Sequence, residues 1–225
     1  MNESIFILKG NIVYSKNQTE FAICEHGYLV CKDGKVDGIY QTLPFRLGGN
    51  PIRDYGDCLI IPGLVDLHIH APQYSYRGLG MDMELLEWLE VNTFPEEAKF
   101  EELDYAEKSY RIFTENIKNS ATTRACIFAT VHRPATLLLM DMLEKSGLDT
   151  YVGKVNMDRN CPDYICEETQ ESADETLEWI KDVNHRKYKN TKPILTPRFT
   201  PSCTDELMEE LKKIKAKTLV IAGTK

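Results

Sequence analysis

From residue 59 onward the sequence alternates short apolar runs with long helical patterns, and this alternation constrains the fold more than any other feature. Such alternation predicts parallel βα units, because two parallel strands need a long crossover connection, usually a helix. The predicted strands span residues 59–70, 122–130, 151–157 and 193–199. The helical patterns that follow them span residues 83–119, 134–146, 168–187 and 204–216, and a fifth strand is predicted at 218–222.

Four such units are half of a closed (β/α)8 barrel, which typically takes about 250 residues. We therefore predict an α/β fold in which residues 62–225 form the N-terminal half of a TIM-type barrel. A complete open sheet of four units is the alternative. Residues 1–61 form a separate β region, with a hairpin turn at Asp33-Gly34. Its predicted strands span residues 5–8, 12–14, 28–31 and 36–40.

Composition narrows the class of protein. Hydrophobic residues make up 42% of the 225 residues, which is ordinary for a globular chain, and the net charge of −8 argues against nucleic-acid binding. No membrane span is predicted, because no apolar run approaches about 18 residues. No secretory signal is predicted, because the start lacks a basic segment and an apolar stretch. Seven cysteines without a framework indicate buried or free thiols in a reducing cytoplasm. Cys161 and Cys166 lack the spacing and second pair of a zinc knuckle and are predicted to be loop cysteines.

The segment from Pro62 to His70 carries the strongest chemical signal. Side chains alternate along a strand, so His68 and His70 point the same way, at the end where barrel enzymes keep their sites. Two imidazoles so placed can bind one metal ion, and zinc suits them. Asp66 lies beneath them, either orienting one ring or accepting a hydrogen bond near the turn. The intervening residues are predicted to pack under helices: Val65, Leu67 and Ile69.

The pattern Pro-Gly-x-x-Asp-x-His-x-His resembles the first-strand signature of the metal-dependent amidohydrolase superfamily. Other stretches, in the same order along the chain, resemble its guanine deaminase family. They are His70-Ala-Pro-Gln-Tyr74, Leu85-Leu-Glu-Trp-Leu89, Thr93-Phe-Pro-Glu96, Phe128-Ala-Thr-Val-His132, Gly153-Lys-Val-Asn-Met-Asp158 and Thr196-Pro-Arg-Phe-Thr-Pro-Ser-Cys203. Residues 1–61 fit part of the small β-sandwich domain that flanks the barrel in this family.

The resemblance implies a cytoplasmic, homodimeric hydrolase of purine catabolism that converts guanine to xanthine and ammonia. It implies zinc on His68 and His70, and guanine contacts from Gln73, Arg198 and Phe199. A single zinc ion is expected, because two-metal members often carry a bridging lysine on strand four, and residues 194–198 contain none.

Plainer interpretations stand beside these roles. Gln73 could be a solvated loop amide, Arg198 a partner in a rim salt bridge, and Phe199 a packing residue. Trp88 is predicted to lie in the core, and His132 to have a structural role. Residues 96, 97, 101 and 102, all glutamates, are predicted to be strongly solvated.

The resemblance also implies later residues that the sequence does not show: two histidine ligands, an aspartate ligand and a proton-shuttling glutamate. No catalytic acid or base is therefore assigned within the chain, and we expect a truncated polypeptide that binds zinc weakly and is inactive by itself. A half barrel would expose two sheet edges, so self-association is expected. The alternatives are another purine or pyrimidine deaminase of the superfamily, and a non-catalytic product that pairs with other chains.

Overall fold

The computed structural model describes residues 4–215, which divide into two compact units. One unit runs up to Gly63 and the other begins at Leu64. The strand predicted at 218–222 lies outside the described residues. Within residues 4–215, no helix is both long and apolar enough to cross a membrane.

The first unit is a four-stranded sheet in the order β3-β2-β1-β4. Its strands are β1 (Ile5–Ser15), β2 (Phe21–Lys32), β3 (Lys35–Tyr40) and β4 (Ile52–Ile60). The predicted hairpin turn is confirmed, since Asp33 and Gly34 join β2 to β3 with φ angles of 49° and 77°. The strands predicted at 5–8 and 12–14 are one strand with a register shift after Gly10. Assigning Leu59 to the first barrel strand was wrong, because β4 pairs with β1.

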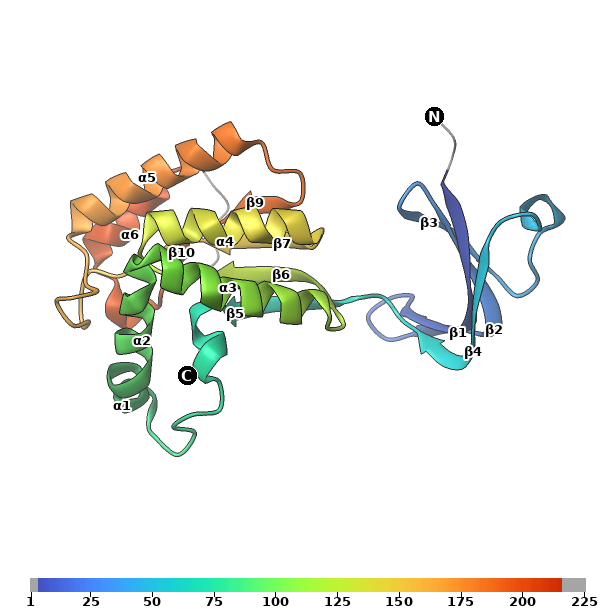
Figure 1. Cartoon of the computed structure of the whole chain (residues 1–225), viewed down its shortest axis with the longest axis horizontal. Coiled ribbons are helices and arrows are strands. Elements are labelled where there is room, and N and C mark those ends of the chain that lie inside the picture. The colour runs from blue at the N-terminus through green and yellow to red at the C-terminus, as the bar shows by residue number, and fades with distance from the viewer. Residues whose placement is uncertain (1–3, 216–225) are drawn as a thin grey trace. The chain divides into compact units, whose positions relative to one another are not determined.

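The second unit contains a parallel sheet in the order β5-β6-β7-β9. Its strands are β5 (Leu64–His70), β6 (Thr122–Phe128), β7 (Asp149–Gly153) and β9 (Thr191–Pro193). A second parallel pair, β8 (Val155–Asn156) and β10 (Thr196–Pro197), follows β7 and β9 along the chain. The strands predicted at 151–157 and 193–199 are thus each interrupted. The α/β class with parallel βα units is confirmed (Figure 1).

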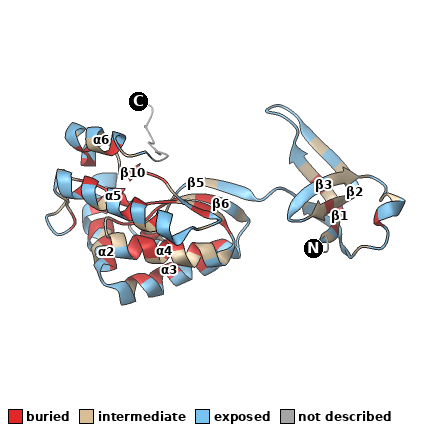
Figure 2. Cartoon of the chain, turned by 90° about the horizontal axis from the view of Figure 1, so that it is seen from above, coloured by how far each residue is buried: buried red, intermediate tan, exposed pale blue. Residues whose placement is uncertain are grey.

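Helices cover this sheet and enclose the main core. The long helices are α3 (Leu103–Lys118), α4 (Arg133–Ser146) and α5 (Thr169–Arg186), and α6 (Asp205–Lys212) is shorter. Helix α4 contacts both α3 and α5 (Figure 1), and its buried face contributes Leu139 and Leu143 to the core (Figure 2). As predicted, α4 stops at Gly147, whose φ of 80° suits a residue without a Cβ.

The helical pattern predicted at 83–119 is broken into several pieces before α3. Helix α1 (Leu85–Trp88) continues through one π-turn (Leu89–Thr93) into α2 (Phe94–Ala98), and a 3-10 turn (Lys99–Glu101) follows. These short helices pack against the turn Pro72–Tyr76, which comes directly after β5. They therefore bring residues of α1 and α2 close to the carboxyl end of β5.

Two predictions about individual side chains were wrong. Val65 and Leu67 are 52% and 65% exposed and belong to none of the core clusters of the described residues, and of the three apolar residues only Ile69 packs against the main core. Cys161 and Cys166 are joined in a disulfide rather than free, since the loop between them brings their Cα atoms to 5.3 Å.

Replacing Leu139 by alanine tests the core on which the site is built. Leu139 is fully buried in α4, so L139A is expected to lower the free energy of unfolding by about 2–5 kcal/mol through lost burial and cavity formation. Urea unfolding followed by circular dichroism measures this. The matched control L177A, on the exposed face of α5 at 42% exposure, is expected to change it far less. Equal effects of the two variants would contradict the described core.

Candidate active site

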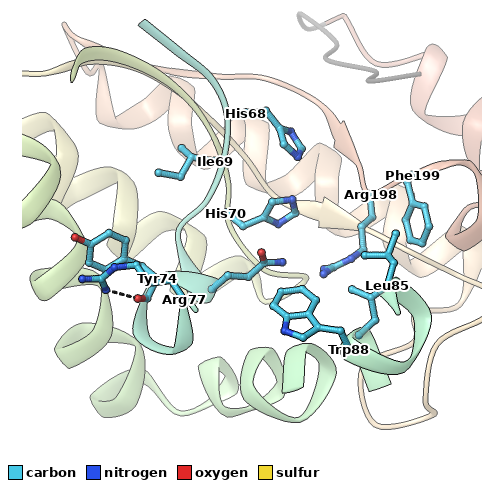
Figure 3. A pocket seen from close by; sticks show the side chains of 11 residues that line it. His68, Ile69, His70, Tyr74, Arg77, Leu85, Trp88, Arg198 and Phe199 are labelled. Carbon is cyan, nitrogen blue, oxygen red and sulfur yellow. Dashed lines mark hydrogen bonds between the residues drawn. The ribbon is translucent and has the colours of Figure 1, made fainter. Parts of the chain in front are cut away.

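One cavity of about 600 Å³ lies where β5 and β10 end, and all five residues predicted to bind metal or guanine line it. They come from three places in the chain: His68 and His70 from β5, Gln73 from the turn after it, and Arg198 and Phe199 from the segment after β10. Figure 3 shows both imidazoles on the side of β5 that faces Arg198. The carboxyl ends of parallel strands meet at one edge, which explains this convergence.

The two imidazoles are close together and are held by an aromatic neighbour. Their ring centroids are 5.0 Å apart with the ring planes at 81°. Phe128, the last residue of β6, stacks on His70 at 4.7 Å and meets His68 edge-on at 4.8 Å. Sequence reasoning missed Phe128, although its place at the end of the neighbouring strand was a usable signal.

The environment keeps both rings in the form that binds metals. Burial lowers the pKa of His70 well below its usual value, and the positive charge of Arg198 lowers it further. Burial also lowers the pKa of His68, against the opposing charge of Asp66. Neutral imidazole is the ligand form. Moreover, the buried Nδ1 of His70 has no hydrogen-bond partner among the described residues. These observations fit a zinc ion bound by imidazole.

Two imidazoles do not complete such a site. Among residues 4–215 no group of three or more histidine, cysteine or carboxylate side chains is placed to hold a metal ion. Zinc sites in proteins use three or four protein ligands. The part of the chain that the structure describes therefore brings together two imidazoles, which is fewer side chains than a complete zinc site uses.

The carboxylate of Asp66 is hydrogen-bonded to the backbone of β5 and not to an imidazole. Its Oδ1 accepts a hydrogen bond from the backbone N–H of His68 at 3.1 Å. Of the two interpretations given for Asp66, this hydrogen bond supports the local acceptor.

A buried ion pair joins the cavity wall to helix α2. The Nη1 and Nη2 atoms of Arg198 donate to the two carboxylate oxygens of Glu97, at 2.5 and 3.0 Å, and Gln73 Nε2 donates to Glu97 Oε1 at 3.3 Å. The prediction that Glu97 is solvated was wrong, because only 1% of the residue is exposed. Its spacing from the buried Thr93 and Phe94, four and three residues earlier, was the signal that places it on the inner face of α2.

The remaining candidates have mixed surroundings. Phe199 lines the cavity and also packs against a small cluster that includes Phe94 and Met157. Trp88 does the same, and its Nε1 donates to the carbonyl oxygen of Leu79 at 2.8 Å, so it is not purely a core residue. His132 lies outside the cavity lining, with its Nδ1 3.2 Å from the hydroxyl of Thr130, which fits the predicted structural role.

Comparison with known proteins agrees with this geometry. A family model described as the Amidohydrolase family matches residues 59–222. The guanine deaminase of Homo sapiens is 48% identical over 161 residues, covering 70% of this chain and 35% of that protein. The guanine deaminase of Dictyostelium discoideum is 44% identical over 160 residues, covering 71% of this chain and 36% of that protein.

A solved structure extends the match to three dimensions. The crystal structure of guanine deaminase from C. acetobutylicum, with bound guanine in its active site, superposes with a TM-score of 0.87 at 47% identity. The superposition covers 93% of this chain and 50% of that one. The chain thus spans about a third of the length of the curated relatives it matches and half of this structure. Because the family model matches well over half of its residues, the chain belongs to the amidohydrolase family.

Proposed function

We propose that residues 64–215 form the guanine-binding wall and part of the metal site of a zinc-dependent guanine deaminase. The reaction is the hydrolysis of guanine to xanthine and ammonia. The observation that carries this proposal is the convergence of two neutral imidazoles with an arginine and an amide on one cavity. Its support is the likeness to guanine deaminases, one of them with guanine bound.

Each residue has a role that its chemistry allows. His68 and His70 would hold one zinc ion, and Phe128 keeps their rings in place. When bound, zinc supplies the acidification of water that makes hydroxide available near neutral pH. Arg198 donates to an acceptor on the purine, Gln73 offers an amide that reads its edge, and Phe199 presents a ring face to the base. Leu85 and Trp88 add apolar side chains to the lining of the cavity.

The setting of this enzyme belongs to the same proposal. We infer a cytoplasmic enzyme of purine catabolism that works as a homodimer and binds no nucleic acid. The net charge of −8 supports the last inference, because nucleic-acid binding depends on neutralising phosphates.

Removal of one imidazole tests the metal site. Zinc is expected to bind the 225-residue chain weakly, and H70A is expected to reduce that affinity at least about tenfold, since one of two ligands is lost. Competition with a zinc-sensitive chelator measures the affinity. The control H185A removes an exposed imidazole on α5 and is expected to have no effect. Equal affinities of H70A and H185A would place the zinc elsewhere, for example on cysteines.

A guanine-binding experiment tests the proposed roles of Gln73, Arg198 and Phe199 separately from the metal site. Guanine is expected to change the fluorescence of Trp88, which lines the cavity, whereas Trp179 is fully buried in the main core. R198Q is expected to weaken guanine binding about tenfold, because a hydrogen bond from a charged group is lost. A panel with adenine and cytosine decides between guanine and other bases. Failure of the wild-type chain to bind guanine would contradict the proposal that guanine is the substrate.

Turnover is the third test. The 225-residue chain is expected to release no ammonia from guanine, because its described residues offer two metal ligands where a catalytic zinc wants at least three. A coupled ammonia assay with added zinc measures this. Clear turnover by the pure chain would show that the metal site is completed in a way the described residues do not reveal.

A further inference from the structure

The carboxylate of Glu97 is the most deeply buried charge beside the cavity. The side chains of Glu97 and Arg198 are 1% and 3% exposed, and they form a bidentate pair across 101 positions of sequence. Burying both charges carries a desolvation cost that good geometry only partly offsets. The pair therefore calls for an explanation beyond joining α2 to the end of β10.

Glu97 contacts both residues proposed to read guanine through hydrogen bonds. Besides the two bonds from Arg198, it accepts the Nε2 amide hydrogen of Gln73 at 3.3 Å. Only an acceptor satisfies both neighbours at once, and a carboxylate has enough lone pairs for three donors. The three side chains come from α2, from the turn after β5 and from the segment after β10.

These contacts determine what remains for a ligand. With Nε2 of Gln73 committed to Glu97, its Oε1 is left as an acceptor, and no described residue donates to it. With one hydrogen on each Nη of Arg198 committed, the Nε–H and the outer hydrogens remain as donors. Arg198 thus offers fixed hydrogen-bond donors, and the Oε1 of Gln73 offers a fixed acceptor beside them.

We propose that Glu97 is a positioning residue that sets base specificity by holding Arg198 and by fixing which way the amide of Gln73 faces. The inference rests on the proposed function. On guanine the C6 carbonyl oxygen lies beside the N1–H, an acceptor next to a donor, which complements this wall. Adenine presents the reverse, an amino donor beside an unprotonated N1. Arg198 and Gln73, held in this orientation, therefore bind guanine in preference to adenine.

The test compares guanine and adenine binding to the 225-residue chain by Trp88 fluorescence. The variant E97Q has nearly the same shape, but its amide can donate as well as accept, so Gln73 becomes free to turn over. The affinity for guanine is expected to fall about tenfold, and the ratio of guanine affinity to adenine affinity is expected to fall by about the same factor. If Glu97 had a purely structural role, E97Q would weaken the binding of both bases equally and leave the ratio of their affinities unchanged.

The matched control is E96Q, the neighbouring carboxylate. Glu96 accepts hydrogen bonds from Lys99 and Tyr105 and lies outside the cavity lining. We expect both affinities to stay as in the wild type. An equal loss of selectivity in E96Q and E97Q would assign the effect to α2 in general and overturn the role of Glu97.

A double variant covers the case in which E97Q fails to fold because Arg198 is left unpaired. R198Q/E97Q removes both charges, and circular dichroism checks each protein. If E97Q does not fold, R198Q/E97Q is compared with R198Q alone: R198Q keeps the bond from Gln73 to Glu97, so the double variant is expected to have the lower ratio of guanine to adenine affinity, and equal ratios would overturn the inference. If E97Q folds, it is expected to cost less guanine affinity in the R198Q background than in the wild type, because the part that acts through Arg198 is already lost. Additive losses, or a selective E97Q protein, would overturn the inference while leaving the proposed function intact. A wild-type chain that binds no guanine would overturn both.

Discussion

The bidentate pair between Glu97 and Arg198 is the interaction on which the geometry of the cavity depends. It joins helix α2 to the segment after β10, and these two pieces also meet in the apolar cluster that includes Phe94 and Phe199. Removing one partner of such a buried pair typically costs about 3–5 kcal/mol, because the other charge is left without compensation. The shape and the charge of the cavity are therefore coupled, because a change at the carboxylate of Glu97 also alters the position of the Arg198 donors.

Features with a local cause could be read from the sequence. The period of two along residues 64–70 places His68 and His70 on one face, and the Asp33-Gly34 turn and the Gly147 stop follow from backbone preferences of single residues. The parallel βα order follows from alternation of patterns, and it brings Arg198 to the same edge of the sheet as the histidines. For the shared face of the histidines, the turn and the helix stop, the information lies within a few residues of the feature; for the βα order, it lies in the repeated alternation of patterns along the chain.

Features that arise from contacts distant in sequence could not be read in this way. Glu97, next to Glu96, is predicted from the sequence to be solvated, but it is buried because Arg198, 101 positions later, pairs with it. The breaks between β7 and β8 and between β9 and β10 likewise depend on tertiary contacts: buried Lys154 bonds Glu167, and Thr196 Oγ1 donates to the carbonyl oxygen of Lys154. Local propensity does not encode such partners, so the strands at 151–157 and 193–199 were predicted as continuous.

The same ion pair also bears on the metal. Arg198 is close enough to His70 to lower the pKa of its imidazole, so its positive charge reaches the place where a cation would bind. An uncompensated guanidinium there would repel a divalent ion, most strongly where water is excluded. The carboxylate of Glu97, bonded directly to the guanidinium, offsets that repulsion while leaving hydrogen-bond donors available. The proposed binding of a cation beside a hydrogen-bond acceptor in this cavity therefore favours a buried anion next to the arginine, and Glu97 supplies that anion.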